Sequence, residues 1–197
     1  MKHLELAVIG KLLSSEEEVA ESCRHFVEVC PTCRERFEQV DALMKRFRHW
    51  DAETLVAEAP AAEELLDALL DKGQGAADWA SVLSDEAESQ TWCVAWVALE
   101  RAQGLLAQDA TRAQARNLAR LAAAIAGNLG DAYDPDSLAD LKAFAYAIAA
   151  AAGLPGGDDM LREVAAAVTA LDEGTGDPTV ANDVKGLLAR VFRKAAV

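Results

Sequence analysis

The second half of the chain consists of consecutive helix-length segments, and this pattern most constrains the fold. Apolar residues recur there at helical spacing, and short joints rich in Gly, Asp and Pro separate the segments. Short joints of this kind are typical of antiparallel helical hairpins. The pattern predicts five helices, at residues 91–108, 111–130, 138–154, 158–174 and 180–196. We therefore expect an all-α protein.

The first 50 residues predict a smaller group of three helices. Residues 4–13 form an amphipathic segment, and Ser15 with Glu18 forms a capping box for a second helix. Pro31 suits the first turn of a third helix, because its missing N–H needs no partner there. The third helix carries an apolar stripe made of Phe37, Val40, Met44 and Phe47.

The segment RHFVEVCPTC, residues 24–33, brings one histidine and two cysteines close together in the chain. Because Pro31 begins a helix between the cysteines, we expect both thiols near a helix N-terminus, which lowers their pKa and favours the metal-binding thiolate. Histidine and thiolate ligands suit tetrahedral zinc. The alternatives are a redox dithiol, which normally follows a β-strand, and a pair of inert buried thiols.

A structural zinc site needs four ligands. The sequence predicts one structural Zn²⁺, and its expected ligands are His3, His25, Cys30 and Cys33. His3 is the expected fourth ligand because the first helix, paired antiparallel with the second, would begin beside the second helix's end; Cys23 is the alternative. His49 lies several turns beyond the start of the third helix and is expected on the surface. Cys93 is expected as a small buried residue of an apolar helix.

The early His3, the SSEEE helix start and HFVEVCPTC followed by RERF resemble the zinc-associated anti-sigma module, found at the N-terminus of many bacterial anti-sigma factors. The resemblance covers about residues 1–50. It implies a zinc-binding helical module and, as one candidate function, a regulator that sequesters a sigma factor. The common spacing of the module is HxxxCxxC, whereas this chain has HxxxxCxxC. The longer spacing is similar to a variant found ahead of helical-repeat proteins in some bacteria.

Residues 138–178 resemble one tetratricopeptide (TPR) repeat. Alanines at positions 143, 145 and 147 suit close helix packing, Gly157 begins the turn, and Asp177-Pro178 marks the end of the repeat. The resemblance implies stacked helical hairpins that expose a groove for peptides or proteins. A plain helical bundle is the alternative. The last predicted helix is then either a cap or the first helix of a further repeat.

Charge and composition divide the chain into three parts. We expect a zinc-binding module at residues 1–50, an acidic connector with one short amphipathic helix at 51–76, and a TPR-like helical domain at 77–197. The net charge is −14, and residues 51–100 carry twelve Asp and Glu against one Lys. This charge repels phosphates, which argues against a nucleic-acid partner and favours a protein with a basic surface. The alternative is that the charge only keeps the protein soluble.

The connector helix supplies the expected partner contacts. It combines an apolar stripe with an acidic face, as helices that lie in a partner's groove do. The expected contacts are Leu65, Leu66, Leu69, Leu70, Glu63, Glu64 and Asp67, with Asp71 on the same acidic face. The alternative is that the leucines pack against the chain's own helices.

The sequence contains no motif typical of an enzyme. GxSxG, Walker A and HExxH patterns are absent, and with two of the three histidines assigned to metal little remains for acid–base catalysis. No apolar run is long enough to cross a bilayer, and the N-terminus does not resemble a signal peptide. We therefore expect a cytoplasmic, bacterial, non-enzymatic interaction adaptor that combines a zinc module with a TPR-like scaffold, and no membrane partner.

Overall fold

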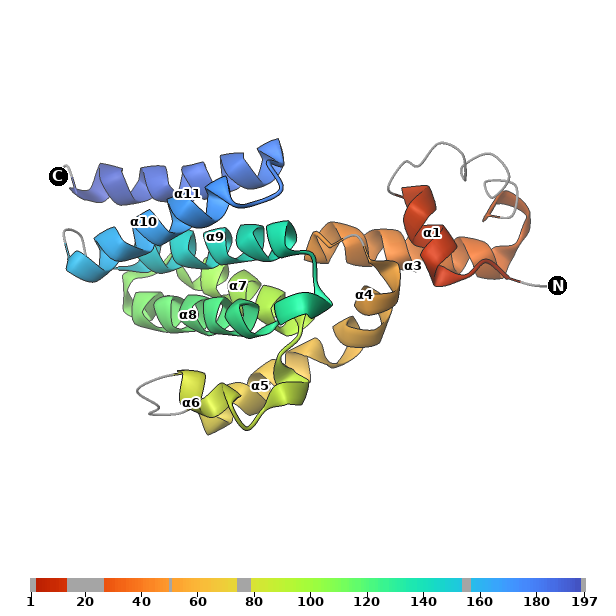
Figure 1. Cartoon of the computed structure of the whole chain (residues 1–197), viewed down its shortest axis with the longest axis horizontal. Helices are drawn as coiled ribbons and strands as arrows, with labels where there is room; N and C mark the ends of the chain where they lie inside the picture. Colours follow the sequence, from red (N-terminus) through yellow and green to blue (C-terminus); the bar gives the residue numbers. More distant parts are fainter. Residues whose placement is uncertain (1–2, 14–26, 50, 74–78, 154–156, 196–197) are drawn as a thin grey trace. The chain divides into compact units, whose positions relative to one another are not determined.

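All regular elements in the described part of the chain are helical (Figure 1). The computed structural model describes residues 3–13, 27–49, 51–73, 79–153 and 157–195. The all-α prediction is confirmed for these residues. By its internal contacts the chain divides into two units, residues 1–61 (unit 1) and residues 62–197 (unit 2).

Unit 1 contains α1 (Leu6–Leu13), α3 (Pro31–Phe47) and α4 (Ala52–Glu58), and each of them packs against the other two. Val40, Met44 and Phe47 of the predicted stripe are buried, and Phe37 is half-buried. The second predicted helix falls mostly outside the described residues; only its end, residues 27–29, is described, and it is helical. The stripe prediction is thus confirmed at the positions that face α1 and α4.

Helix α4 was not expected as a member of the N-terminal module. Arg48 ends α3 in the left-handed conformation, with φ 48° and ψ 39°, and donates its backbone N–H to Met44. Asp51 then caps α4 by accepting a hydrogen bond from the N–H of Glu53 at 3.0 Å. Since α4 packs on α1 and α3, unit 1 extends to residue 61, beyond the expected boundary at residue 50.

The described residues of unit 2 include the five helices predicted for the second half of the chain, preceded by two shorter α-helices. Each of the five begins within three residues of its predicted start. The helices of unit 2 are α5 (Ala62–Lys72), α6 (Trp79–Leu83), α7 (Trp92–Leu105), α8 (Arg112–Asn128), α9 (Pro135–Ala152), α10 (Asp158–Asp172) and α11 (Pro178–Ala195). Helix α5 packs on α7, so the expected connector is not a separate part of the chain.

Helix α9 lies at the centre of unit 2. It packs against α7, α8, α10 and α11 (Figure 1), and its many small alanines are buried around most of its circumference. It begins at Pro135, where the Asp134 carboxylate accepts a hydrogen bond from the N–H of Ser137 at 2.9 Å. Consecutive helices joined by short segments therefore lie side by side. None of the described helices combines the length and the apolar character that a membrane span requires.

Candidate metal centre

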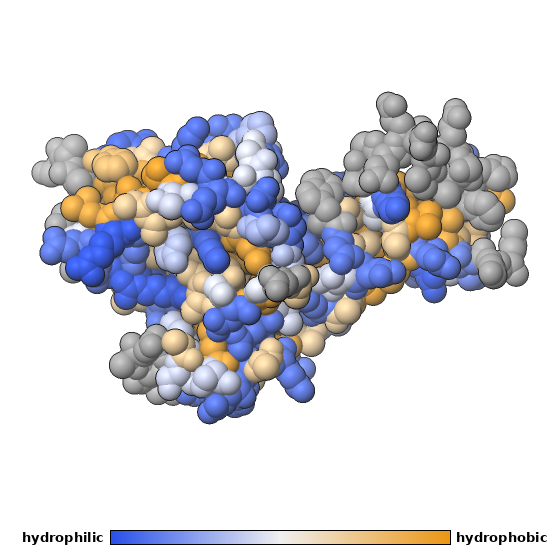
Figure 2. Space-filling view, viewed as in Figure 1, coloured by the Kyte–Doolittle hydropathy of each residue, from blue (hydrophilic) through white to orange (hydrophobic). Residues whose placement is uncertain are grey.

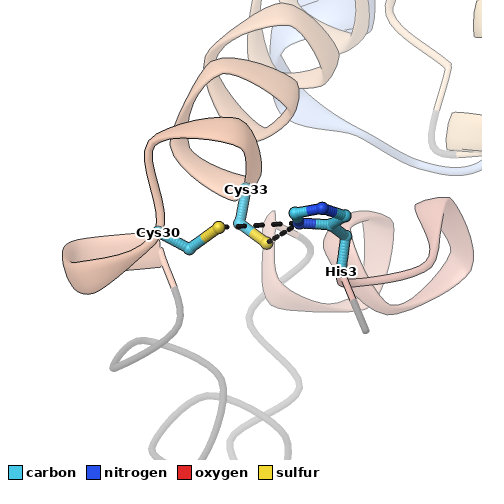
Figure 3. A group of neighbouring side chains, drawn as sticks. All are labelled: His3, Cys30 and Cys33. Carbon is cyan, nitrogen blue, oxygen red and sulfur yellow. Dashed lines mark hydrogen bonds between the residues drawn. The ribbon is translucent and has the colours of Figure 1, made fainter. Parts of the chain in front are cut away.

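His3, Cys30 and Cys33 come together in unit 1 from segments far apart in the sequence (Figure 3). His3 lies shortly before α1, Cys30 is the residue before α3, and Cys33 lies in the first turn of α3. The His3 Nδ1 atom is 3.6 Å from the Cys30 Sγ and 3.8 Å from the Cys33 Sγ. These three atoms all lie within 4.8 Å of one another, so the cluster could hold a metal ion.

The start of α3 determines where the two thiols lie. Pro31 occupies the first turn, as predicted, and Cys30 remains in an extended conformation with φ −102° and ψ 112°. The backbone N–H of Cys33, at the free N-terminal end of the helix, lowers the pKa of the Cys30 thiol. A lowered thiol pKa favours the thiolate, which is the form that binds metals.

The peptide units on either side of Leu4 fix the position of His3. The Leu4 N–H donates to the Cys33 Sγ at 3.5 Å, and the Leu4 carbonyl accepts from Arg36 Nη1, also at 3.5 Å. The Cys33 side chain is fully buried beneath this contact. The segment that carries His3 is thus held to α3 from both directions, which orients the imidazole toward the thiols.

Arg34 holds the segment that precedes Cys30. Its Nε donates to the Val27 carbonyl at 3.3 Å, and its Nη2 donates to the Glu28 carbonyl. Arg36, on the same helix, holds the Leu4 carbonyl. In the structure both arginines bind backbone carbonyls, and they fix the two chain segments that supply the cluster's residues.

The other residues weighed for the metal site have different outcomes. His25 and the alternative ligand Cys23 lie outside the described residues. His49 was expected on the surface, and this was wrong: only 8% of it is exposed, because the left-handed Arg48 turns the chain inward between α3 and α4. Cys93 is fully buried in α7, as predicted.

The expected partner-binding residues of α5 are largely engaged within unit 2. Leu66 and Leu69 are fully buried, whereas the other two leucines of the stripe are half-buried. Glu63 and Asp67 form ion pairs with Arg101 of α7, at 2.6 and 2.5 Å. The stripe therefore packs against the chain's own helices, and of the acidic face only Glu64 and Asp71 are exposed without a described ion pair.

An open cleft of about 940 Å³ lies along α8, next to the end of α9. Three arginines line it at positions four residues apart, Arg112, Arg116 and Arg120. Arg116 and Arg120 both pair with Glu163 of α10, at 3.1 and 2.8 Å. Since the Glu163 side chain is only 9% exposed, these pairs also join α8 to α10.

Comparison of the chain with protein-family models, with curated proteins and with solved structures gave no match. The function must therefore be argued from the cluster and the helices themselves.

Proposed function

We propose that this chain is a protein-interaction adaptor in which a structural zinc ion stabilises unit 1 and the stacked helices of unit 2 bind a protein partner. The observation that carries the proposal is the spacing of the three donor atoms of His3, Cys30 and Cys33. The proposed role of the metal is structural, because protein side chains would fill all of its positions.

The donor spacing agrees with tetrahedral zinc. With Zn–S near 2.3 Å and Zn–N near 2.05 Å, the edges of a regular tetrahedron are about 3.6 Å between S and N. The two S–N distances of 3.6 and 3.8 Å are close to that value. One imidazole and two thiolates are also the donor types that select zinc over the hard cations, which prefer oxygen. His25 is the proposed fourth ligand, with Cys23 as the alternative.

The adaptor part of the proposal rests on the helix order of unit 2. Helix α9 packs on the hairpin before it, on its own partner α10 and on the following α11, which is the neighbour pattern of a helical repeat array. The exposed acidic residues Glu64 and Asp71 are the proposed contact region, and the α8 cleft is the alternative. The acidic charge favours a partner with a basic surface over a nucleic acid.

Metal analysis of the purified full-length protein tests the zinc site. We expect one zinc per chain, and we expect His3→Ala and Cys33→Ser to remove most of it. Cys93→Ala is the matched control, because Cys93 is a buried thiol in unit 2 and should not affect the metal content. Metal-free protein with Cys30 and Cys33 freely titratable would contradict the proposal.

Capture of partners by the zinc-loaded protein from its own cells tests the adaptor function. Reversal of Glu64 and Asp71 to lysine should slow association with a basic partner, since charge complementarity mainly speeds encounter. Reversal of the exposed Asp85 and Glu88 is the control for net charge. Unchanged binding in all variants would move the contact to the α8 cleft.

A second candidate function is an anti-sigma factor. The observation that favours it is the short distance from the His3 imidazole to both cysteines of the CPTC segment. Under this candidate the captured protein is a sigma factor, and its binding depends on the zinc-loaded unit 1. Purified sigma factor that binds equally well to Cys33→Ser would exclude it.

A further inference from the structure

An apolar seam runs along the solvent-facing side of α10. The seam repeats at the three–four spacing of a coiled-coil heptad, and all of its positions are exposed. Its apolar residues are Leu161, Ala165 and Val168, and Asp158 and Asp172 occupy the same spacing at its two ends. Leu161 is 54% exposed and Val168 is 45% exposed, whereas the opposite side of α10 is buried against the rest of unit 2. The seam is therefore a helix-packing surface without a helix on it among the described residues.

Helix α11 extends this surface. Lys185 and Phe192 lie seven residues apart on one flank of α11 and are both exposed, Phe192 by 55%, whereas Leu188 between them is buried. Figure 2 shows apolar residues gathered over α10 and α11, near the C-terminal end of α11. Four large apolar side chains are strongly exposed among the described residues, and three of them belong to these two helices. Clustering of this kind marks an interaction surface, whereas single exposed apolar residues are ordinary.

The charges on this surface are divided between the two helices. Acidic Asp158 and Asp172 end the seam on α10, while the flank of α11 carries Lys185 and Arg193. Lys185 has no ion-pair partner in the described part of the chain. A surface with one acidic helix and one basic helix is complementary to itself under a twofold rotation, which brings α10 of each copy against α11 of the other.

The charges also select between two twofold arrangements. Antiparallel pairing of α10 with the α10 of a second copy would place Asp158 opposite Asp172 at both ends of the seam, and like charges at an interface are unfavourable. Pairing of α10 with α11 instead places acidic residues opposite basic ones twice. Apolar contacts then supply affinity, and the charges fix the pairing.

We propose that the α10–α11 surface is a homodimer interface and that its occupant is a second copy of this chain. The interface is isologous, with α10 of each copy packed against α11 of the other. This inference does not depend on the zinc site or on the adaptor function, because it rests only on residues of unit 2.

Light scattering of the zinc-loaded full-length protein after size exclusion tests the interface. We expect a dimer, and we expect Phe192→Asp to raise the dimer Kd at least tenfold, because it places a charge in the apolar centre. Gln103→Asp, an exposed position on α7, is the control and should leave the dimer intact. A wild-type protein that stays monomeric at roughly millimolar concentration would overturn the proposal.

A pair of charge reversals tests the pairing of the helices. Lys185→Glu with Arg193→Glu makes both helices acidic, and Asp158→Lys with Asp172→Lys makes both basic. Each variant alone should be monomeric, whereas an equimolar mixture should form a heterodimer; circular dichroism shows that each variant is folded. Dimers that persist in both variants, no recovery on mixing, or a different protein cross-linked at this surface would each overturn the proposal.

Discussion

At the level of single residues, we expect the proposed metal centre to depend on backbone contacts as much as on its ligands. Arg36 holds the Leu4 carbonyl, and the Leu4 N–H contacts the Cys33 sulfur. We expect Arg36→Ala to lower zinc affinity about tenfold, because groups that orient the ligands typically contribute that much. Competition with a chromophoric chelator measures the affinity. Lys45→Ala is the control, since Lys45 lies on the same helix but pairs with Asp41; equal affinities for the two variants would contradict the role of Arg36.

Asp140 is a buried carboxylic acid of unit 2. It is 7% exposed on α9, and its Oδ2 accepts a hydrogen bond from the Thr175 hydroxyl at 2.5 Å, in the joint between α10 and α11. A Cβ at Gly174 would lie 2.0 Å from the Asp140 Oδ1, so the joint fits closely over the carboxyl group only with glycine. Burial raises the pKa of Asp140 above its ordinary value.

A raised pKa makes unit 2 less stable as the pH increases. The protonated carboxyl group is favoured in the folded state, so its contribution to the free energy of unfolding is complete below the ordinary pKa and is lost as the pH rises through the folded pKa. We expect Asp140→Asn to remove this loss and to raise stability at neutral pH relative to wild type. Urea unfolding at acid and neutral pH measures the free energy of unfolding of the variant and of the wild type. Asp85→Asn, at an exposed position of unit 2 outside the α10–α11 surface, is the control; the same pH profile for both variants would contradict the prediction.

At the level of helices, the sequence predicts those that have a regular apolar period and misses features that depend on contacts between distant segments. The five long helices were found because their apolar residues recur at helical spacing. Helix α4 is too short to show a period, and its burial depends on the turn at Arg48, which no pattern encodes. The start of α9 could have been found, because Asp134 before Pro135 is a recognisable helix start.

The candidate metal site likewise has residues that the sequence predicts and residues that it does not. Cys30 and Cys33 were predicted as neighbours because Pro31 begins a helix between them, and His3 was added through the expected antiparallel pairing of the first and second helices. The roles of Leu4 and Arg36 were missed, since a contact between a backbone carbonyl and a side chain 32 positions away leaves no trace in the sequence.

The apolar stripe of α5 provides a test at this level. Leu66 is fully buried, whereas Leu65, on the flank of the same helix, is half-buried. We expect Leu66→Ala to lower the free energy of unfolding of unit 2 by about 2–5 kcal/mol, as for other buried leucines, because it leaves a cavity. Urea unfolding measures the loss, and Leu65→Ala is the control with a smaller expected effect. Equal losses would mean that α5 does not pack through Leu66.

For the molecule as a whole, we expect the two units to reach stability by different means. Unit 1 has a core formed by α1, α3 and α4 in the described residues, and a unit of 61 residues buries a smaller share of its surface than a larger one. Small units of this size often need a metal ion in addition to their core. Unit 2 surrounds the buried, alanine-rich α9 with four other helices, and we expect this larger core to suffice without a metal. The metal should therefore stabilise one unit and leave the other unaffected.

Removal of zinc from the full-length protein tests this division. In a metal-dependent unit the binding energy is largely folding energy, so a chelator should expose the backbone amides of α3 to hydrogen exchange. The amides of α9 should stay protected, because their burial comes from α7, α8, α10 and α11. Exchange measured by mass spectrometry reports both helices in one sample, and Cys33→Ser should reproduce the effect without chelator. Protection of α3 that survives zinc removal would show that the core of unit 1 suffices alone, whereas loss of protection in both helices together would show that the units fold as one.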